Sequence, residues 1–178
     1  MMDLSMKIPP GELERLAGMF QLSKEACRRA ARRAVRKTAK WTEGQAARSM
    51  SAQLRIQQKI IRQRLRIYTK GDGLDQKIWL GLNSLAARRL GMPRRRGVGT
   101  QVGSHFFEGA FSIQKYGGGV YRRTGKGRFP LELAKIEIDD AGAASLVNAA
   151  KKAEARLMEI MRQELRYEFS KVLKKAGS

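Results

Sequence analysis

Residues 139–172 read DDAGAASLVNAAKKAEARLMEIMRQELRYEFSKV, and this stretch decides the fold. Apolar side chains recur in it at steps of three and four residues for about 30 residues, which is the period of one helix face. Acidic and basic side chains interleave on the rest of the surface, which favours packing against protein over contact with DNA. We therefore predict a long amphipathic helix in the core or at a subunit interface. The positions predicted for a subunit interface are Leu157, Ile160, Met161, Leu165 and Phe169.

The N-terminal part of the chain also has helical patterns. Residues 9–20 open with two prolines and then carry apolar residues at helical spacing, which predicts a short helix. Ser23 is the expected N-cap of a long second helix, whose inner stripe consists of small residues such as Ala30 and Ala34. Residues 51–66 contain no proline or glycine, so we predict that helix continues or restarts there.

The second helix carries basic residues around the rest of its circumference. Two interpretations are open: a solvated cationic face on an ordinary packed helix, or a face that meets phosphates or an acidic subunit. We favour contact with DNA or an acidic partner. The residues predicted to make that contact are Arg28, Arg29, Arg32, Arg33, Arg36 and Lys37.

The middle of the chain has strand patterns. Residues 77–82 predict one strand, and β-branched or aromatic residues between glycine-rich turns predict three more at 106–114, 119–124 and 131–138. We expect these four to pair as an antiparallel meander. Residues 85–90 suggest a helical turn, whereas residues 94–104 combine three arginines with three glycines and predict a mobile basic loop that is not packed.

Together these elements predict an α+β fold with N-terminal basic helices, a small antiparallel sheet of about four strands and a long C-terminal amphipathic helix. We divide the chain into an N-terminal helical, basic region, residues 1–70, and a sheet with the C-terminal helix, residues 71–178, integrated as one domain. No apolar run is long enough to span a bilayer, so we expect no membrane partner. The N-terminus lacks a signal-peptide pattern and Cys27 is the single cysteine, which predicts folding in a reducing cytosol.

The chain is strongly basic. Its 37 Lys and Arg residues against 16 Asp and Glu give a formal net charge of +21, which creates a field that attracts polyanions. The excess is concentrated in residues 1–130, because residues 131–178 contain 9 basic and 8 acidic side chains. Nucleic acid is therefore the first partner to consider. Further candidates for contact with DNA or an acidic partner are Arg94, Arg95, Arg96, Arg122 and Arg123.

Residues for enzymatic chemistry are scarce. One histidine, His105, and one cysteine, Cys27, cannot supply a nucleophile with its base and orienting group, nor the four ligands of structural zinc. Asp72 and Asp75 lack the further carboxylates of a calcium loop. The glycine spacing in residues 117–127 does not fit a nucleotide-binding loop. We predict no catalytic residue, no metal site and no cofactor, and read Cys27 as a small buried hydrophobe.

One family resemblance rests on three consecutive segments. They are Phe107 to Phe111 (FEGAF), Gly119 to Arg123 (GVYRR) and Phe129 to Ile136 (FPLELAKI), followed by the C-terminal helix. Their order and the Ala- and Arg-rich N-terminal helix resemble the lambda-type minor tail protein Z family of phage tail completion proteins. Glu108 stands where that family usually has proline, and Arg32-Arg33 where an Asn-Arg pair is common, which indicates a distant member. The structural motif residues are Gly109, Ala110, Phe111, Gly119, Phe129 and Pro130.

The resemblance implies a non-enzymatic role at the head-proximal end of a phage tail, where the protein completes the tail so that it can join the head. It implies a ring, of six copies, in contact with tail terminator, tail tube and neck proteins, and genomic DNA held without sequence preference in the passage. The expected location is the virion tail and neck, and the host cytoplasm during assembly. A nonspecific nucleic-acid-binding protein of the host is the alternative, whereas a nuclease would need a carboxylate cluster that residues 71–130 lack.

Overall fold

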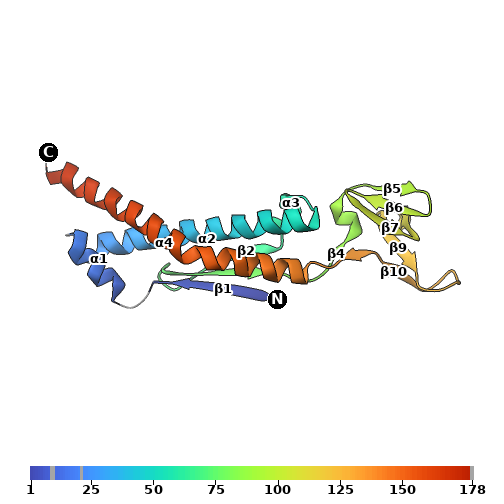
Figure 1. Cartoon of the computed structure of the whole chain (residues 1–178), viewed down its shortest axis with the longest axis horizontal. Coiled ribbons are helices and arrows are strands. Elements are labelled where there is room, and N and C mark those ends of the chain that lie inside the picture. The colour runs from blue at the N-terminus through green and yellow to red at the C-terminus, as the bar shows by residue number, and fades with distance from the viewer. Residues whose placement is uncertain (9–10, 21, 177–178) are drawn as a thin grey trace.

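The protein is elongated, with a helical body at one end and a small β-module at the other (Figure 1). The computed structural model describes residues 1–8, 11–20 and 22–176. We call residues 82–138 the distal module and the remaining elements the helical body. The α+β class, with helices, small antiparallel sheets and a long C-terminal helix, is confirmed.

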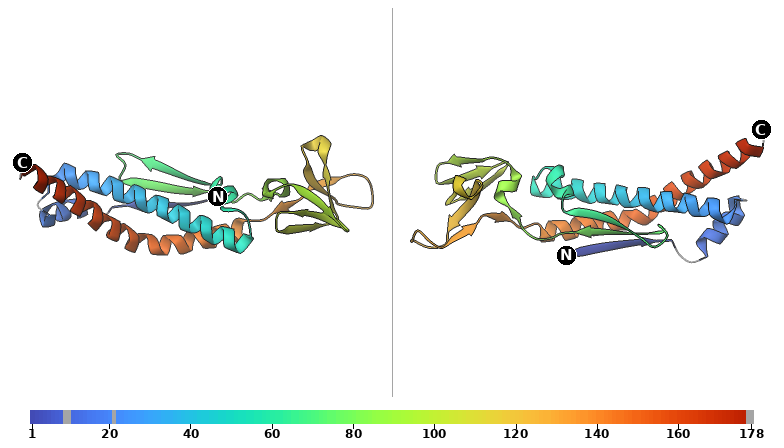
Figure 2. Two further views of the ribbon diagram at one scale, coloured as in Figure 1. Left: turned by 90° about the horizontal axis from the view of Figure 1, so that it is seen from above. Right: turned by 180° about the vertical axis from the view of Figure 1, so that it is seen from behind.

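Two long helices form the helical body and lie against each other along most of their length (Figure 2). Ser23 caps the second helix as predicted, because its hydroxyl accepts a hydrogen bond of 3.2 Å from the Ala26 amide. Ala30, Ala31 and Ala34 are fully buried at the contact, so their small side chains let the two backbones approach closely. The helices of the body are α1 (Glu12–Phe20), α2 (Lys24–Leu54), α3 (Gln58–Arg62) and α4 (Asp139–Ala176).

The helix predicted to continue or restart over residues 51–66 does both but is shorter, since α2 continues to Leu54, helix restarts as α3 at Gln58–Arg62, and β2 begins at Leu65. The α2 helix ends at Leu54, where Arg55 adopts a left-handed backbone with φ 50°, and the chain then forms α3 and enters a strand. A three-stranded antiparallel sheet in the order β1-β3-β2 covers one face of the helices (Figure 2). Its strands are β1 (Met2–Lys7), β2 (Leu65–Lys70) and β3 (Asp75–Leu80).

Strand β3 corresponds to the strand predicted at 77–82, but its predicted pairing with the central meander is wrong. It pairs with β1 on one side and β2 on the other, with Ile78 opposite both Leu4 and Ile67. Because β1 and β2 come from residues 1–70 and β3 from residues 71–178, the predicted division at residue 70 runs through this sheet. Ile78 and Leu80 are fully buried beneath the helices.

The distal module consists of short antiparallel sheets. The mobile loop predicted at 94–104 is wrong, since these residues form a hairpin whose second strand pairs with a third. The meander predicted from 106 to 138 is present, although each predicted strand is divided or shortened. The strands and 3-10 turns are β4 (Leu85–Ala86), η1 (Ala87–Leu90), β5 (Pro93–Arg96), β6 (Gly99–Val102), β7 (His105–Glu108), β8 (Ala110–Ile113), η2 (Gln114–Tyr116), β9 (Gly119–Arg123), β10 (Leu131–Leu133) and β11 (Lys135–Ile136).

One hydrophobic cluster runs from the helical body into the distal module. It joins Met50, Ile78 and Leu146 of the body to Val102 and Val120 of the module. At the junction Gly142 allows close packing, because a Cβ at this position would lie 2.8 Å from Leu82 Cδ2. The apolar core is therefore continuous across the junction between the module and the body. Within the described part of the chain, no helix is long and apolar enough to cross a membrane.

Candidate nucleic-acid interface

Three basic residues of α2 bind carboxylates of α4 in the same chain. Arg33 Nη2 donates to Glu168 at 2.7 Å, and Arg29 Nη2 donates to the other oxygen of the same carboxylate at 3.2 Å. Arg33 Nε and Lys37 Nζ both donate to Glu164. The side chains of Glu164 and Glu168 are only 7% and 3% exposed. These five residues form a network that fastens α2 to α4.

The two carboxylates stay charged although they are buried. Burial alone would raise the pKa of each, since it disfavours the charged form. At Glu164, hydrogen bonds from Lys37 and Arg33 outweigh burial, so its pKa lies below the ordinary value. Hydrogen bonds from Arg33 and Arg29 have the same effect on the pKa of Glu168. Both carboxylates are therefore ionised at neutral pH.

The network changes the interpretation of the six basic residues predicted on α2. Arg29, Arg33 and Lys37 already have carboxylate partners within the chain. Arg28 lies 3.9 Å from Asp72, in the turn between β2 and β3. Arg32 and Arg36 are exposed. The Arg32 side chain lies beside Gly73, since a Cβ added to that glycine would be 3.6 Å from Arg32 Cγ.

Of the apolar α4 residues predicted for a subunit interface, most are buried within this chain and one is exposed. Ile160, Met161 and Leu165 are buried against the first half of α2, so they belong to the core of this chain. Leu157 is partly buried beside them. Phe169 is 37% exposed and belongs to the C-terminal part of α4. The C-terminal end of this helix stands away from the rest of the body (Figure 1). Cys27 is fully buried in the same cluster, as predicted.

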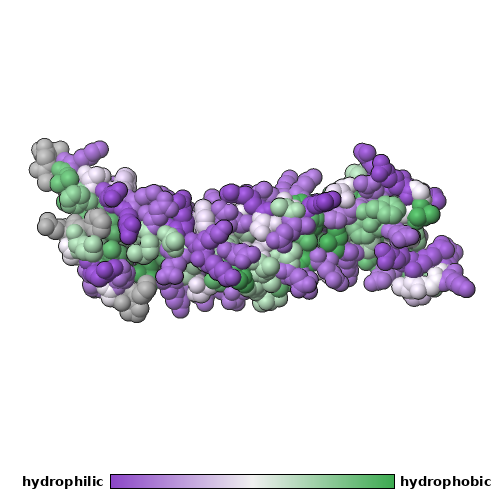
Figure 3. All heavy atoms as spheres, in the orientation of Figure 1, coloured by the Kyte–Doolittle hydropathy of each residue, from purple (hydrophilic) through white to green (hydrophobic). Residues whose placement is uncertain are grey.

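The basic residues of the distal module form no ion pair within the described part of the chain. The module contains 11 Lys and Arg residues and 3 acidic residues, all within the described part of the chain. None of these cations has a carboxylate oxygen within 4.0 Å. Arg94, Arg95 and Arg96 lie on β5, and Arg122 and Arg123 at the end of β9, and all five are exposed. Figure 3 shows hydrophilic side chains beside apolar ones at this end of the molecule.

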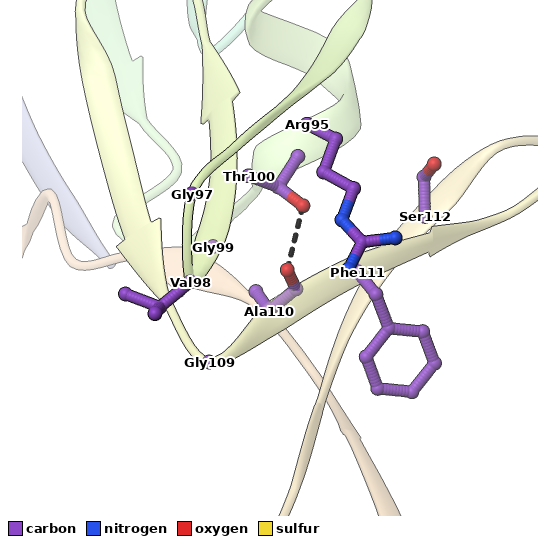
Figure 4. A pocket seen from close by; sticks show the side chains of 9 residues that line it. All are labelled: Arg95, Gly97, Val98, Gly99, Thr100, Gly109, Ala110, Phe111 and Ser112. Carbon is purple, nitrogen blue, oxygen red and sulfur yellow. Dashed lines mark hydrogen bonds between the residues drawn. The ribbon is translucent and has the colours of Figure 1, made fainter.

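Two sheets face each other within the module, one formed by β5, β6 and β7 and the other by β8, β9 and β10. Ala110 of the second sheet is buried, and the Thr100 hydroxyl on β6 donates to its carbonyl at 2.7 Å (Figure 4). Beside this bond is a hollow of about 350 Å³, into which Arg95 extends (Figure 4). The exposed arginines of β5 and β9 therefore project from packed sheets rather than from loops.

The two glycines of the family motif, Gly109 and Gly119, occupy their positions for different structural reasons. Gly109 adopts φ +65° between β7 and β8, and no atom lies within 4 Å of a Cβ built there. A close backbone approach at Gly109 would be expected from its neighbouring phenylalanines, and the structure contradicts it. The close approach occurs at Gly99, where a Cβ would lie 2.3 Å from the Phe107 carbonyl oxygen. Gly119 is also crowded, because a Cβ there would meet the Tyr121 ring at 2.7 Å.

The remaining motif and chemical residues are also placed. Ala110 anchors β8, Phe111 lies on the opposite face of that strand, and Phe129-Pro130 forms a cis peptide in the loop before β10. His105 is half-buried at the start of β7. Among the described residues, no three His, Cys, Asp or Glu side chains lie close enough together to hold a metal ion.

These features define an elongated α+β protein with an internally braced helical body and a cationic distal end. The family model of prophage minor tail protein Z matches residues 14–176, and the chain belongs to that family. It is thus a structural protein of a phage tail. Neither the comparison with curated proteins nor that with solved structures gave a match.

Proposed function

We propose that this protein completes the phage tail at its head-proximal end and that its distal module faces the DNA passage. One observation carries the second half of the proposal: the 11 cations of the module have no carboxylate partner, whereas several of those on α2 do. Unpaired cations on a packed scaffold suit contact with phosphates, which gives affinity without sequence preference.

A ring of copies would multiply this charge around the passage. Six copies, as the family resemblance implies, would place every distal module in an equivalent position. The helical body would then contact neighbouring copies and the tail terminator, tail tube and neck proteins. Phe169, Val172 and Leu173 near the end of α4 are exposed apolar residues that suit such a protein contact. The role requires no turnover and no cofactor.

The test is complementation of a phage that lacks the gene. We expect lysates of the deletion to contain filled heads and separate tails by electron microscopy, and the wild-type gene to restore joined particles. The triple variant Arg94→Gln, Arg95→Gln and Arg96→Gln should fold normally and restore joining poorly. Joined particles from the deletion itself would overturn the tail-completion role. Full rescue by the triple variant would show that β5 does not contact the DNA in the passage.

A further inference from the structure

The outer face of the β8–β9–β10 sheet differs from an ordinary solvated surface. Antiparallel register places Phe111 opposite Tyr121 and Arg123 opposite Leu131, so these four side chains lie on one face. It is the opposite face of β8 from the one that carries Ala110, whose carbonyl accepts a hydrogen bond from Thr100 on β6. Apolar and aromatic side chains are thus half-buried where a solvent-facing sheet would carry polar ones.

Two loops raise the rim of this face and turn it into a groove of about 370 Å³. The turn at η2 supplies Lys115 and Tyr116, and the loop before β10 supplies Arg128 and Phe129. Tyr116 is 54% exposed and Phe129 is 64% exposed, although the Tyr116 ring also meets the Tyr121 ring edge to face, with 6.0 Å between their centres.

Cations stand beside the rings of the groove. The Arg123 guanidinium lies 5.6 Å from the centre of the Phe111 ring, and that of Arg128 lies 5.7 Å from the Phe129 ring. Since no acidic residue lines the groove, neither guanidinium is neutralised there. The groove therefore offers flat aromatic faces and positive charges side by side.

We propose that this groove binds unpaired nucleotides of single-stranded DNA, an inference that rests on the proposed contact with DNA. Bases would stack on Tyr116, Phe129 and Phe111, while Lys115, Arg123 and Arg128 would contact the phosphates. Duplex DNA cannot use the rings, because its bases are already stacked on each other, and it would contact the module through phosphates alone. An acidic protein segment would use the cations and leave the exposed rings without a role.

The first experiment measures binding of the full-length protein to three fluorescent probes by anisotropy: a 12-nucleotide oligo-dT, a 12-base-pair duplex and a poly-glutamate peptide. The double variant Tyr116→Ala and Phe129→Ala should raise the Kd for oligo-dT at least about tenfold, because stacking contributes roughly 1–3 kcal/mol per base. Its Kd for the duplex should change less than about twofold, since phosphate contacts are kept.

Phe106→Ala is the matched control. Phe106 is an aromatic residue of the same module, 51% exposed on β7, and it does not line the groove. We expect this variant to bind all three probes as the wild type does. Circular dichroism and a melting curve of each variant separate loss of binding from loss of folding.

Photocrosslinking gives a second readout that does not depend on affinity. An oligonucleotide containing 5-bromodeoxyuridine should crosslink to Tyr116 or Phe129, identified by mass spectrometry. Equal losses for oligo-dT and duplex in the double variant, crosslinks confined to other residues, or tighter binding of poly-glutamate than of oligo-dT would each overturn the inference. These outcomes leave the deletion test of tail completion unaffected, so the two proposals fail separately.

Discussion

Arg33 on α2 and Glu168 on α4 are 135 residues apart in the sequence and are joined by a hydrogen bond of 2.7 Å. Glu168 is buried and Arg33 is one-third exposed, so the bond lies at the edge of the contact between the two helices. The contact with DNA or an acidic partner that the sequence suggests for Arg33 stays a prediction. The hydrogen bond makes the stability of the fold a property that should depend directly on Arg33.

We expect Arg33→Gln to lower the free energy of unfolding by about 2–4 kcal/mol, since Glu164 and Glu168 would each lose a charged donor while remaining buried. Urea unfolding followed by circular dichroism measures this change. Arg36→Gln is the control, because Arg36 lies on the same helix, is exposed and has no carboxylate within 4.0 Å among the described residues. Its effect should stay within about 0.5 kcal/mol. Equal effects of the two variants would contradict the internal network.

The same network predicts how stability depends on pH. The pKa values of Glu164 and Glu168 are lowered in the folded protein, so protons bind these groups more tightly in the unfolded chain. Their contribution is complete above the unfolded pKa of about 4.3 and is lost as the pH falls through the lower folded values. We expect the double variant Glu164→Gln and Glu168→Gln to be less stable than the wild type at pH 7 and to approach it at pH 3. Unfolding curves at both pH values test this, and a constant difference would contradict it.

The fold class could be predicted because the helices have strong local patterns. The apolar stripe of α4 and the small-residue stripe of α2 each lie in one continuous segment, and both helices are observed. The pairing of strands could not be predicted, because β3 pairs with strands that precede it and not with the meander that follows it. Strand β1 did have a signal, the alternation of Met2, Leu4 and Met6 with polar residues, which sequence reasoning missed.

The hairpin of β5 and β6 depends on a glycine that the sequence suggested as part of a mobile loop. Because a Cβ at Gly99 would lie 2.3 Å from the Phe107 carbonyl oxygen, Gly99→Ala must push β6 away from β7. We expect a loss of about 1–3 kcal/mol, as for other overpacked sites. Gly109→Val should also destabilise, by about 1–2 kcal/mol, but through its left-handed backbone. Gly125→Ala is the control, since a Cβ there meets nothing within 4 Å. A melting curve for Gly99→Ala that matches this control would contradict the close approach.

The arginines of β5 and β9 that the sequence predicts to contact DNA or an acidic partner lie exposed, and the contact itself stays a prediction. The groove was not found, because Phe111, Tyr116 and Phe129 meet only through sheet register and two loops. Nor does the sequence show that Glu164 and Glu168 face α2. Reversing Arg32 and Arg33 to glutamate would therefore add a carboxylate beside two buried ones, so that variant tests folding as much as DNA contact.

Duplex binding by the distal module should depend strongly on salt. Each phosphate contact that is lost reduces the slope of log K against log salt by about 0.9. We therefore expect the triple variant Arg94→Gln, Arg95→Gln and Arg96→Gln to reduce that slope by about 2–3 and to weaken binding equally for unrelated duplex sequences. Lys151→Gln, Lys152→Gln and Arg162→Gln remove the same charge from exposed positions on α4 and form the matched control. Anisotropy titrations across a series of salt concentrations measure both slopes. Equal reductions in the two variants would show that net charge attracts the DNA without a defined contact at β5, whereas a reduction confined to the β5 variant would locate the phosphate contacts on the distal module.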